Sequence, residues 1–168
     1  MIATLWNEIA PNKVAIINSS AIKPSTLAYS VPADSLYRRM MEVSDNFLAE
    51  QILIVASSTL SDTLSSAKAR KYMLENELKD LKQEALWVDG SGLSRYNLFT
   101  PSTIVQLLTK LYKKVPQERL FHFFPVGGEF GTIKSWYAGK DKPYVYAKTG
   151  TLENNHNVSG FLLTNSGK

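Results

Sequence analysis

The chain has 168 residues, of which 44% are hydrophobic and 11% aromatic. This is enough for one domain of ordinary size with a packed core, so disorder is not expected. The net charge of +4 comes from 19 basic and 15 acidic residues. Because these charges are scattered rather than clustered, they do not indicate nucleic-acid binding. The chain has no cysteine, which excludes disulfides and cysteine-ligated metals. No apolar stretch has the length of a membrane span, and the first residues lack the pattern of a secretory signal.

The first part of the chain combines an irregular segment with a long helical pattern. Residues 13–22 favour a short strand, and residues 23–34 favour a loop punctuated by prolines. A helix is expected to begin at about Asp34, because the side chains of Asp34 and Ser35 can both cap it. A second apolar group continues the helical pattern to about Ser57, and it is apolar nearly all round. We therefore expect this second helical segment to be buried.

The rest of the chain predicts two more helices and then two strands. Residues 61–83 form an amphipathic pattern that Asp62 can cap, and a glycine-bearing turn follows it. Thr100-Pro101 is typical of a helix start with proline in its first turn. The C-terminal residues alternate as a strand, break at Gly150 and resume as a second strand. Helices followed by strands predict an α+β fold in which helices pack on an antiparallel sheet.

Two short strings could carry chemistry, and each has a purely structural alternative. Ser44-Asp45-Asn46 lies between two helical runs and is compatible with a helix end followed by a new N-cap. Lys148-Thr149-Gly150 is compatible with an edge strand that carries a protective lysine. His122 and His156 are the only histidines. They are far apart and have no carboxylate at ligand spacing, so neither a metal site nor a Ser-His-Asp triad is expected.

Taken together, the two strings resemble two of the three signatures of the penicillin-recognising serine enzymes, S-x-x-K, S-D-N and K-T-G. Their surroundings, "VDGSGLSRYNLFTP", "FPVGGEFGTIKSW" and "YAKTGTLENNHNVSGFLLTNSGK", resemble the class C low-molecular-mass penicillin-binding proteins, the D-alanyl-D-alanine carboxypeptidase/endopeptidase family. The resemblance covers residues 34–168 and implies a partial β-lactamase/transpeptidase-like domain there. Residues 1–33 would be the tail of an upstream inserted region.

The resemblance implies a role for each residue of the two strings. Ser44 would lie beside a catalytic lysine and pass protons toward the leaving amine. Asn46 would hydrogen-bond the amide carbonyl of the substrate and help to orient that lysine. Lys148 would supply positive charge. The remaining substrate-binding residues would be Thr149, whose hydroxyl meets the terminal carboxylate, Gly150, which leaves room for the peptide, and Thr151, whose N–H donates to an oxyanion.

The S-x-x-K nucleophile of this family is the part that the chain does not clearly supply. Ser20 and Ser65 each begin such a string, but Pro24 follows the first string directly and disfavours a helix there. Ser65 follows the S-D-N string instead of preceding it, and it is predicted to lie in mid-helix. In the resembled family the nucleophile lies far upstream, so we expect a chain that is truncated at both ends and inactive in isolation.

The implied activity is that of a serine-type carboxypeptidase/endopeptidase that acts on peptidoglycan stem peptides by acylation and hydrolysis, without a cofactor. β-Lactam antibiotics would inhibit the parent protein covalently, and the parent would work in the periplasm or otherwise outside the cytoplasm. Two alternatives stay open at this point. One is a serine β-lactamase, which shares these signatures. The other is a non-catalytic module that binds peptidoglycan peptides in the same groove. The residues Asp89, Ser91 and Gly92 are interpreted as a structural turn near the site, with a substrate contact as the alternative.

Overall fold

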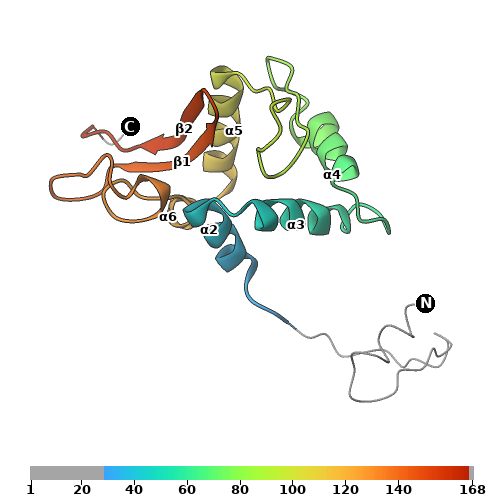
Figure 1. The fold of residues 1–168 in the computed structure, drawn as a ribbon, viewed down its shortest axis with the longest axis horizontal. Helices are drawn as coiled ribbons and strands as arrows, with labels where there is room; N and C mark the ends of the chain where they lie inside the picture. Colours follow the sequence, from blue (N-terminus) through green and yellow to red (C-terminus); the bar gives the residue numbers. More distant parts are fainter. Residues whose placement is uncertain (1–28, 167–168) are drawn as a thin grey trace. The chain divides into compact units, whose positions relative to one another are not determined.

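The computed structural model describes residues 29–166. The chain divides into two units, Met1–Ser30 and Val31–Lys168, and the helices and strands of the described residues belong to the second unit (Figure 1). The strand predicted over residues 13–22 lies outside the described residues. In chain order the elements are α2 (Ala33–Val43), α3 (Asn46–Ser57), α4 (Ser66–Tyr72), the π-helical turn η2 (Met73–Glu77), α5 (Pro101–Lys114), α6 (Gln117–His122), the 3₁₀ turn η3 (Gly131–Ile133), β1 (Val145–Leu152) and β2 (Asn155–Leu162). Within residues 29–166, none of these helices has the length and apolarity of a membrane span.

The two strands form an antiparallel hairpin in which Val145 faces Leu162 and Leu152 faces Asn155. Only two residues connect the strands, and the second of them, Asn154, has a φ of 62°. Asparagine tolerates this left-handed conformation, which a tight hairpin turn requires. The predicted break at Gly150 was wrong, because Gly150 pairs with Asn157 inside the ladder.

Helix α5 begins as the sequence predicts and packs on the hairpin. The Thr100 side chain accepts a hydrogen bond from the N–H of Thr103, and proline occupies the first turn. Tyr112 of α5 lies against Phe161 of β2, with ring centroids 5.8 Å apart. The core cluster beside it consists of the buried residues Leu120, Phe121 and Phe124, surrounded by partly buried side chains from α2, α5 and both strands. Helices α5 and α6 therefore bury apolar side chains of the hairpin.

The side chains of β1 alternate between two packing partners. The Tyr146 ring stacks on Phe121 of α6, with centroids 4.5 Å apart. Its neighbours Val145 and Ala147 instead form a buried cluster with Ile133 of η3. Successive residues of a strand point to opposite faces, so β1 is held from both sides. This fixes the position of Lys148 and the residues after it.

The helical run of residues 34–57 is divided into two helices. Helix α2 begins after Pro32, with no side-chain cap. The prediction that Asp34 or Ser35 caps the helix was therefore wrong. Asp34 instead forms an ion pair with Arg119 of α6 at 2.8 Å. The predicted burial of α3 was also wrong. Phe47 and Val55 are 69% and 61% exposed, because the rest of the second unit covers only one part of this apolar helix.

Helix α4 is shorter than predicted at both ends. Its N-cap is Ser65, whose Oγ accepts from the N–H of Lys68 at 3.3 Å, and not Asp62. The N–H of Ser65 donates to Oγ of Ser57 at 2.7 Å, which ties the start of α4 to the end of α3. At its other end the α-helix changes to the π turn η2 and stops at Leu78. Ser65 is therefore a capping residue and does not lie in mid-helix as predicted.

Candidate active site

The junction of α2 and α3 is built by the Ser44-Asp45-Asn46 string. Ser44 ends α2 in the left-handed conformation, with a φ of 57°. Asp45 caps α3, because its Oδ1 accepts from the N–H of Leu48 at 2.9 Å, and Asn46 is the first residue of the new helix. The structural alternative of a helix end followed by an N-cap is thus correct for this string. It does not compete with a role in chemistry, because Ser44 and Asn46 both line a cleft at this sharp turn.

Residue 148 connects the hairpin to this junction. The Nζ atom of Lys148 donates to Oγ of Ser44 at 2.8 Å, across 104 positions of sequence, and also to the backbone carbonyl of Thr149. The lysine is partly buried, and burial lowers the pKa of its amino group from the ordinary value of 10.5. A partly desolvated ammonium is a stronger partner for an incoming anion than a fully hydrated one.

The next residues of β1 have their own hydrogen-bonding partners. The Thr149 hydroxyl bonds to Oγ1 of Thr132 in η3 at 2.8 Å. The Thr151 hydroxyl bonds to Nδ1 of His156 on β2 at 2.8 Å. Between them, a Cβ atom added to Gly150 would meet no atom within 4 Å. The two threonine side chains are therefore oriented by the fold, whereas the space at Gly150 is open.

The cleft has a volume of about 420 Å³ and brings these segments together. Three segments form most of its lining: the α2–α3 junction with Ser44, Asp45 and Asn46, the loop residues 90–93, and residues 148–152 of β1. A volume of this size suits a small peptide or drug-sized ligand. The structure thus collects all six residues that the sequence nominates, Ser44, Asn46, Lys148, Thr149, Gly150 and Thr151, around one cavity. Their individual roles remain predictions.

The loop wall is held by a network around Asp89. Its Oδ1 accepts from the N–H of Gly92 at 2.6 Å and from Nδ2 of Asn97 at 2.9 Å, and its Oδ2 accepts from the N–H of Ser94 at 2.7 Å. Burial of the Asp89 carboxyl opposes its ionisation, but these hydrogen bonds outweigh burial and lower its pKa below 3.8. The interpretation of this segment as a structural turn is correct, and its residues 90–93 also line the cleft.

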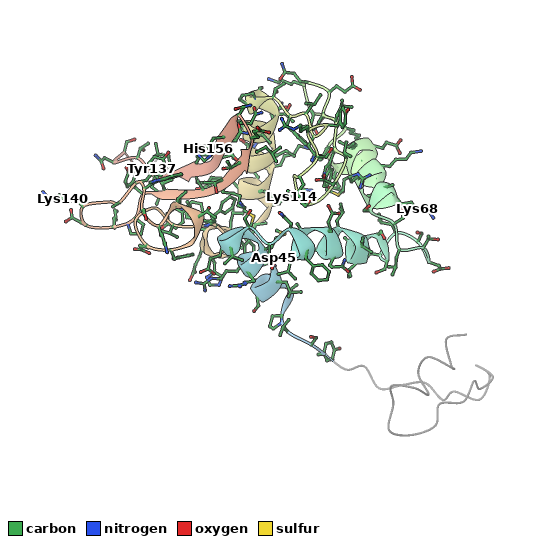
Figure 2. The ribbon with its side chains drawn as sticks, in the orientation of Figure 1. Asp45, Lys68, Lys114, Tyr137, Lys140 and His156 are labelled. Atoms are coloured by element: carbon green, nitrogen blue, oxygen red, sulfur yellow. The ribbon has the colours of Figure 1, made fainter. Side chains whose placement is uncertain are left out.

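Neither candidate nucleophile of the sequence is placed in the cleft. Ser20 lies outside the described residues. Asp45 lies at the start of α3, whereas Ser65 follows the end of that helix. Lys68, the lysine of the same Ser-x-x-Lys string, is well separated from Asp45 (Figure 2). Because α3 has 12 residues at about 1.5 Å rise each, its two ends are roughly 18 Å apart. Ser65 therefore cannot act on a ligand held between Ser44 and residues 148–151.

Two residues near the site were not singled out for it by the sequence. Thr132 contacts Thr149 through a side chain 17 positions away, and His156 contacts Thr151 across the hairpin. Only the strand register, which places His156 opposite Thr151, could have indicated the second contact. Within residues 29–166, no three side chains of the His, Asp or Glu type come together as ligands for a metal ion.

The sequence matches the model of the D-Ala-D-Ala carboxypeptidase 3 (S13) family over residues 9–168. D-alanyl-D-alanine carboxypeptidase DacB of Haemophilus influenzae is 31% identical over 148 residues, which cover 83% of this chain and 30% of that protein. Penicillin-sensitive carboxypeptidase A of Dictyostelium discoideum is 28% identical, over 73% of this chain and 24% of that protein. Carboxypeptidase DacB of Mycolicibacterium smegmatis is 27% identical, over 95% and 37%. The chain thus spans about a third or less of the first two relatives and 37% of the third.

The structure is similar to part of a known penicillin-binding protein. It superposes on the crystal structure of penicillin binding protein 4 (dacB) from Haemophilus influenzae with a TM-score of 0.69 and 28% identity, over 79% of this chain and 31% of that one. A crystal structure of the same protein complexed with a novel beta-lactam gives a TM-score of 0.70 at 28% identity, over 79% and 32%. The helices and the two-stranded hairpin therefore correspond to part of that fold. With a family match that covers nearly the whole sequence, the chain belongs to the D-Ala-D-Ala carboxypeptidase 3 (S13) family.

Proposed function

We propose that this chain forms the substrate-holding part of a serine-type D-alanyl-D-alanine carboxypeptidase/endopeptidase that acts on peptidoglycan stem peptides. One observation carries the proposal. Ser44 and Asn46 line the same cleft as residues 148–151, more than 100 positions later, and Lys148 Nζ lies 2.8 Å from Ser44 Oγ. The family of the chain and the beta-lactam complex of the Haemophilus protein support this function.

In the proposed reaction a serine hydroxyl attacks the carbonyl carbon between the two D-alanines. The amide C–N bond breaks, the terminal D-alanine leaves as an amine after accepting a proton, and water then hydrolyses the ester. Ser44, beside the catalytic lysine, passes this proton, and Lys148, which donates a hydrogen bond to Ser44 Oγ, supplies positive charge. Asn46 hydrogen-bonds the amide carbonyl of the peptide. Such positioned acid–base groups contribute roughly 10²–10⁴-fold to a rate.

Substrate binding in the proposal uses the exposed side of β1. The terminal carboxylate is held by the positive charge of Lys148 and the hydroxyl of Thr149, and the backbone N–H of Thr151 donates to the oxyanion. Gly150 lets the peptide approach the strand. The attacking serine belongs to a Ser-x-x-Lys segment other than Ser65–Lys68. Ser20 of this chain is one candidate, and a segment outside residues 1–168 is the other.

A titration of the isotopically labelled chain with N-acetyl-D-alanyl-D-alanine tests the binding function. Amide shifts at residues 44–46 and 148–151 are expected with the D,D peptide and not with its L,L counterpart. Equal responses to both peptides, or none, would contradict the function for this chain. Fluorescent penicillin followed by peptide mapping tests the nucleophile. Labelling at Ser20 would place it in this chain, whereas labelling only of a longer protein that contains this sequence would place it outside.

The same proposal extends to inhibitors and location. A β-lactam resembles the D-alanyl-D-alanine terminus and carries a carboxylate, so it would occupy the cleft and acylate the nucleophile of the intact protein. Because peptidoglycan lies outside the cytoplasm, the intact protein would work in the periplasm or another extracytoplasmic space. No cofactor takes part in the proposed reaction.

A further inference from the structure

One carboxylate attaches the loop wall of the cleft to helix α3. Oε1 of Glu50 accepts a hydrogen bond from the backbone N–H of Gly90 at 2.9 Å and another from that of Ser91 at 3.0 Å. Hydrogen bonds with an ionised acceptor are about twice as strong as neutral ones. Glu50 thus connects helix α3 to a loop 40 positions later in the sequence, and residues of both segments line the cleft.

The loop also lies in direct backbone contact with α3 at this point. A Cβ atom on residue 90 would lie 2.9 Å from the carbonyl oxygen of Ala49 and 3.3 Å from Cδ2 of Leu53. Only glycine permits such a close approach. The Asp89 network holds the loop together, and Glu50 and this glycine contact attach it to α3.

Helix α3 also carries a residue that lines the cleft. Asn46 is the first residue of the helix, and Glu50 follows it by four positions, so the two side chains lie on one face, one turn apart. The same helical turn therefore carries Asn46, which lines the cleft, and the carboxylate that holds the loop wall. The distance between Asn46 and residues 90–92 is set by this turn.

We propose that Glu50 is a positioning residue for peptide binding: it fixes the wall formed by residues 90–92 at the distance from Asn46 that fits an extended D-alanyl peptide. This inference rests on the proposed function, since it assigns the position of this wall to peptide binding. Glu50 acts through the loop and does not line the cleft itself. Its role needs an oxygen acceptor at the reach of a glutamate side chain, and it needs the negative charge only for strength.

These requirements give each variant a distinct expectation. Glu50→Gln keeps an oxygen at the same reach. The loop should therefore keep its position, and peptide affinity should stay within about threefold of the parent. Glu50→Asp keeps the charge but is one methylene shorter, and Glu50→Ala removes the acceptor. In both, the two N–H groups lose their partner, and peptide affinity should fall by about tenfold or more. Gln51→Ala, at the exposed neighbouring position, is the matched control and should match the parent.

The experiment measures two properties of the full 168-residue chain by two-dimensional NMR. Amide hydrogen exchange at Gly90 and Ser91 should accelerate about tenfold in the Ala and Asp variants and recover in the Gln variant. Titration with N-acetyl-D-alanyl-D-alanine should show a lower affinity in the Ala and Asp variants and recovery in the Gln variant. A merely structural glutamate would lower thermal stability without this parallel loss and rescue of affinity.

The outcomes separate this inference from the function on which it rests. Unchanged exchange in Glu50→Ala would overturn the inference, and so would faster exchange with unaltered affinity. Failure of the parent chain to bind the peptide would refute the proposed function for this chain. In that case the nuclear Overhauser contact between Ala49 and Gly90 decides whether Glu50 positions the loop: its persistence in Glu50→Ala overturns the inference, and its loss with recovery in Glu50→Gln supports it.

Discussion

Gly150→Ala is expected to stabilise the fold while it weakens peptide binding. Gly150 lies inside β1, opposite Asn157, and its φ is not in the left-handed range. A Cβ atom at this position would meet no atom within 4 Å. Alanine can therefore be accommodated without strain, and it restricts the unfolded chain, which stabilises a protein by about 0.4–1 kcal/mol. For a chain of this length the midpoint of thermal unfolding should rise by roughly 1–4 °C.

The same methyl group projects into the open space from which the peptide would approach. Forcing a methyl group into a close-packed contact costs about 1–3 kcal/mol, which corresponds to a loss of affinity of roughly 5- to 150-fold. Thermal unfolding followed by circular dichroism measures the first effect. Titration with N-acetyl-D-alanyl-D-alanine measures the second. Opposite signs of the two effects would distinguish a glycine that serves a ligand from one that serves the fold.

Gly160→Ala is the matched control, because Gly160 serves the fold. A Cβ atom at residue 160 would lie 2.1 Å from the carbonyl oxygen of Tyr146 and 2.5 Å from Cα of Ala147. The strands must separate to admit it, so a loss of about 2 kcal/mol or more is expected. If Gly150→Ala destabilised the chain as much as Gly160→Ala, Gly150 would have a packing role. If it left affinity unchanged, the peptide would not pass along β1 at this point.

Three further substitutions test the electrostatics and orientation of the site. Lys148→Met removes an amino group whose pKa burial holds below 10.5. Between the folded-state pKa and 10.5 folding releases a proton, so the parent should gain stability relative to this variant as the pH rises through that range. Paired thermal unfolding scans at several pH values would show this gain. Asp89→Asn should cost about 1–3 kcal/mol above pH 3.8, and this difference should shrink as the pH falls through the lowered pKa of Asp89, as acid unfolding would measure. Thr132→Val removes the hydroxyl partner of Thr149 and should weaken peptide binding about fivefold, with recovery in Thr132→Ser.

Local sequence signals predicted those elements whose ends are determined locally. The start of α5 was predicted from Thr100-Pro101, and Thr100 does cap it. The hairpin strands were predicted as well, but the turn was misplaced at Gly150 instead of at residues 153 and 154. A glycine in a strand was read as a turn residue, whereas Asn154 adopts the left-handed conformation that the turn needs. Local propensity cannot tell a glycine that bends the chain from one that leaves room for a ligand.

Burial was harder to predict than helicity. The apolar pattern of residues 47–57 predicted a helix correctly, but Phe47 and Val55 are largely exposed. Which side of an apolar helix is covered depends on segments distant in sequence, and periodicity carries no information about them. The start of α4 shows the same effect, because the N–H of Ser65 is fixed by Ser57 from the preceding helix.

The residues of the candidate site divide along a similar line. Ser44, Asn46 and Lys148 could be nominated because their side chains belong to recognisable strings. Glu50 could not, because its partners are the backbone N–H groups of residues 90 and 91, and a backbone donor has the same chemistry at every position except proline. A side chain that holds a backbone segment leaves no complementary residue type in the sequence. Positioning residues of this kind are therefore visible only in the folded chain, and the Glu50 variants test whether this glutamate is one of them.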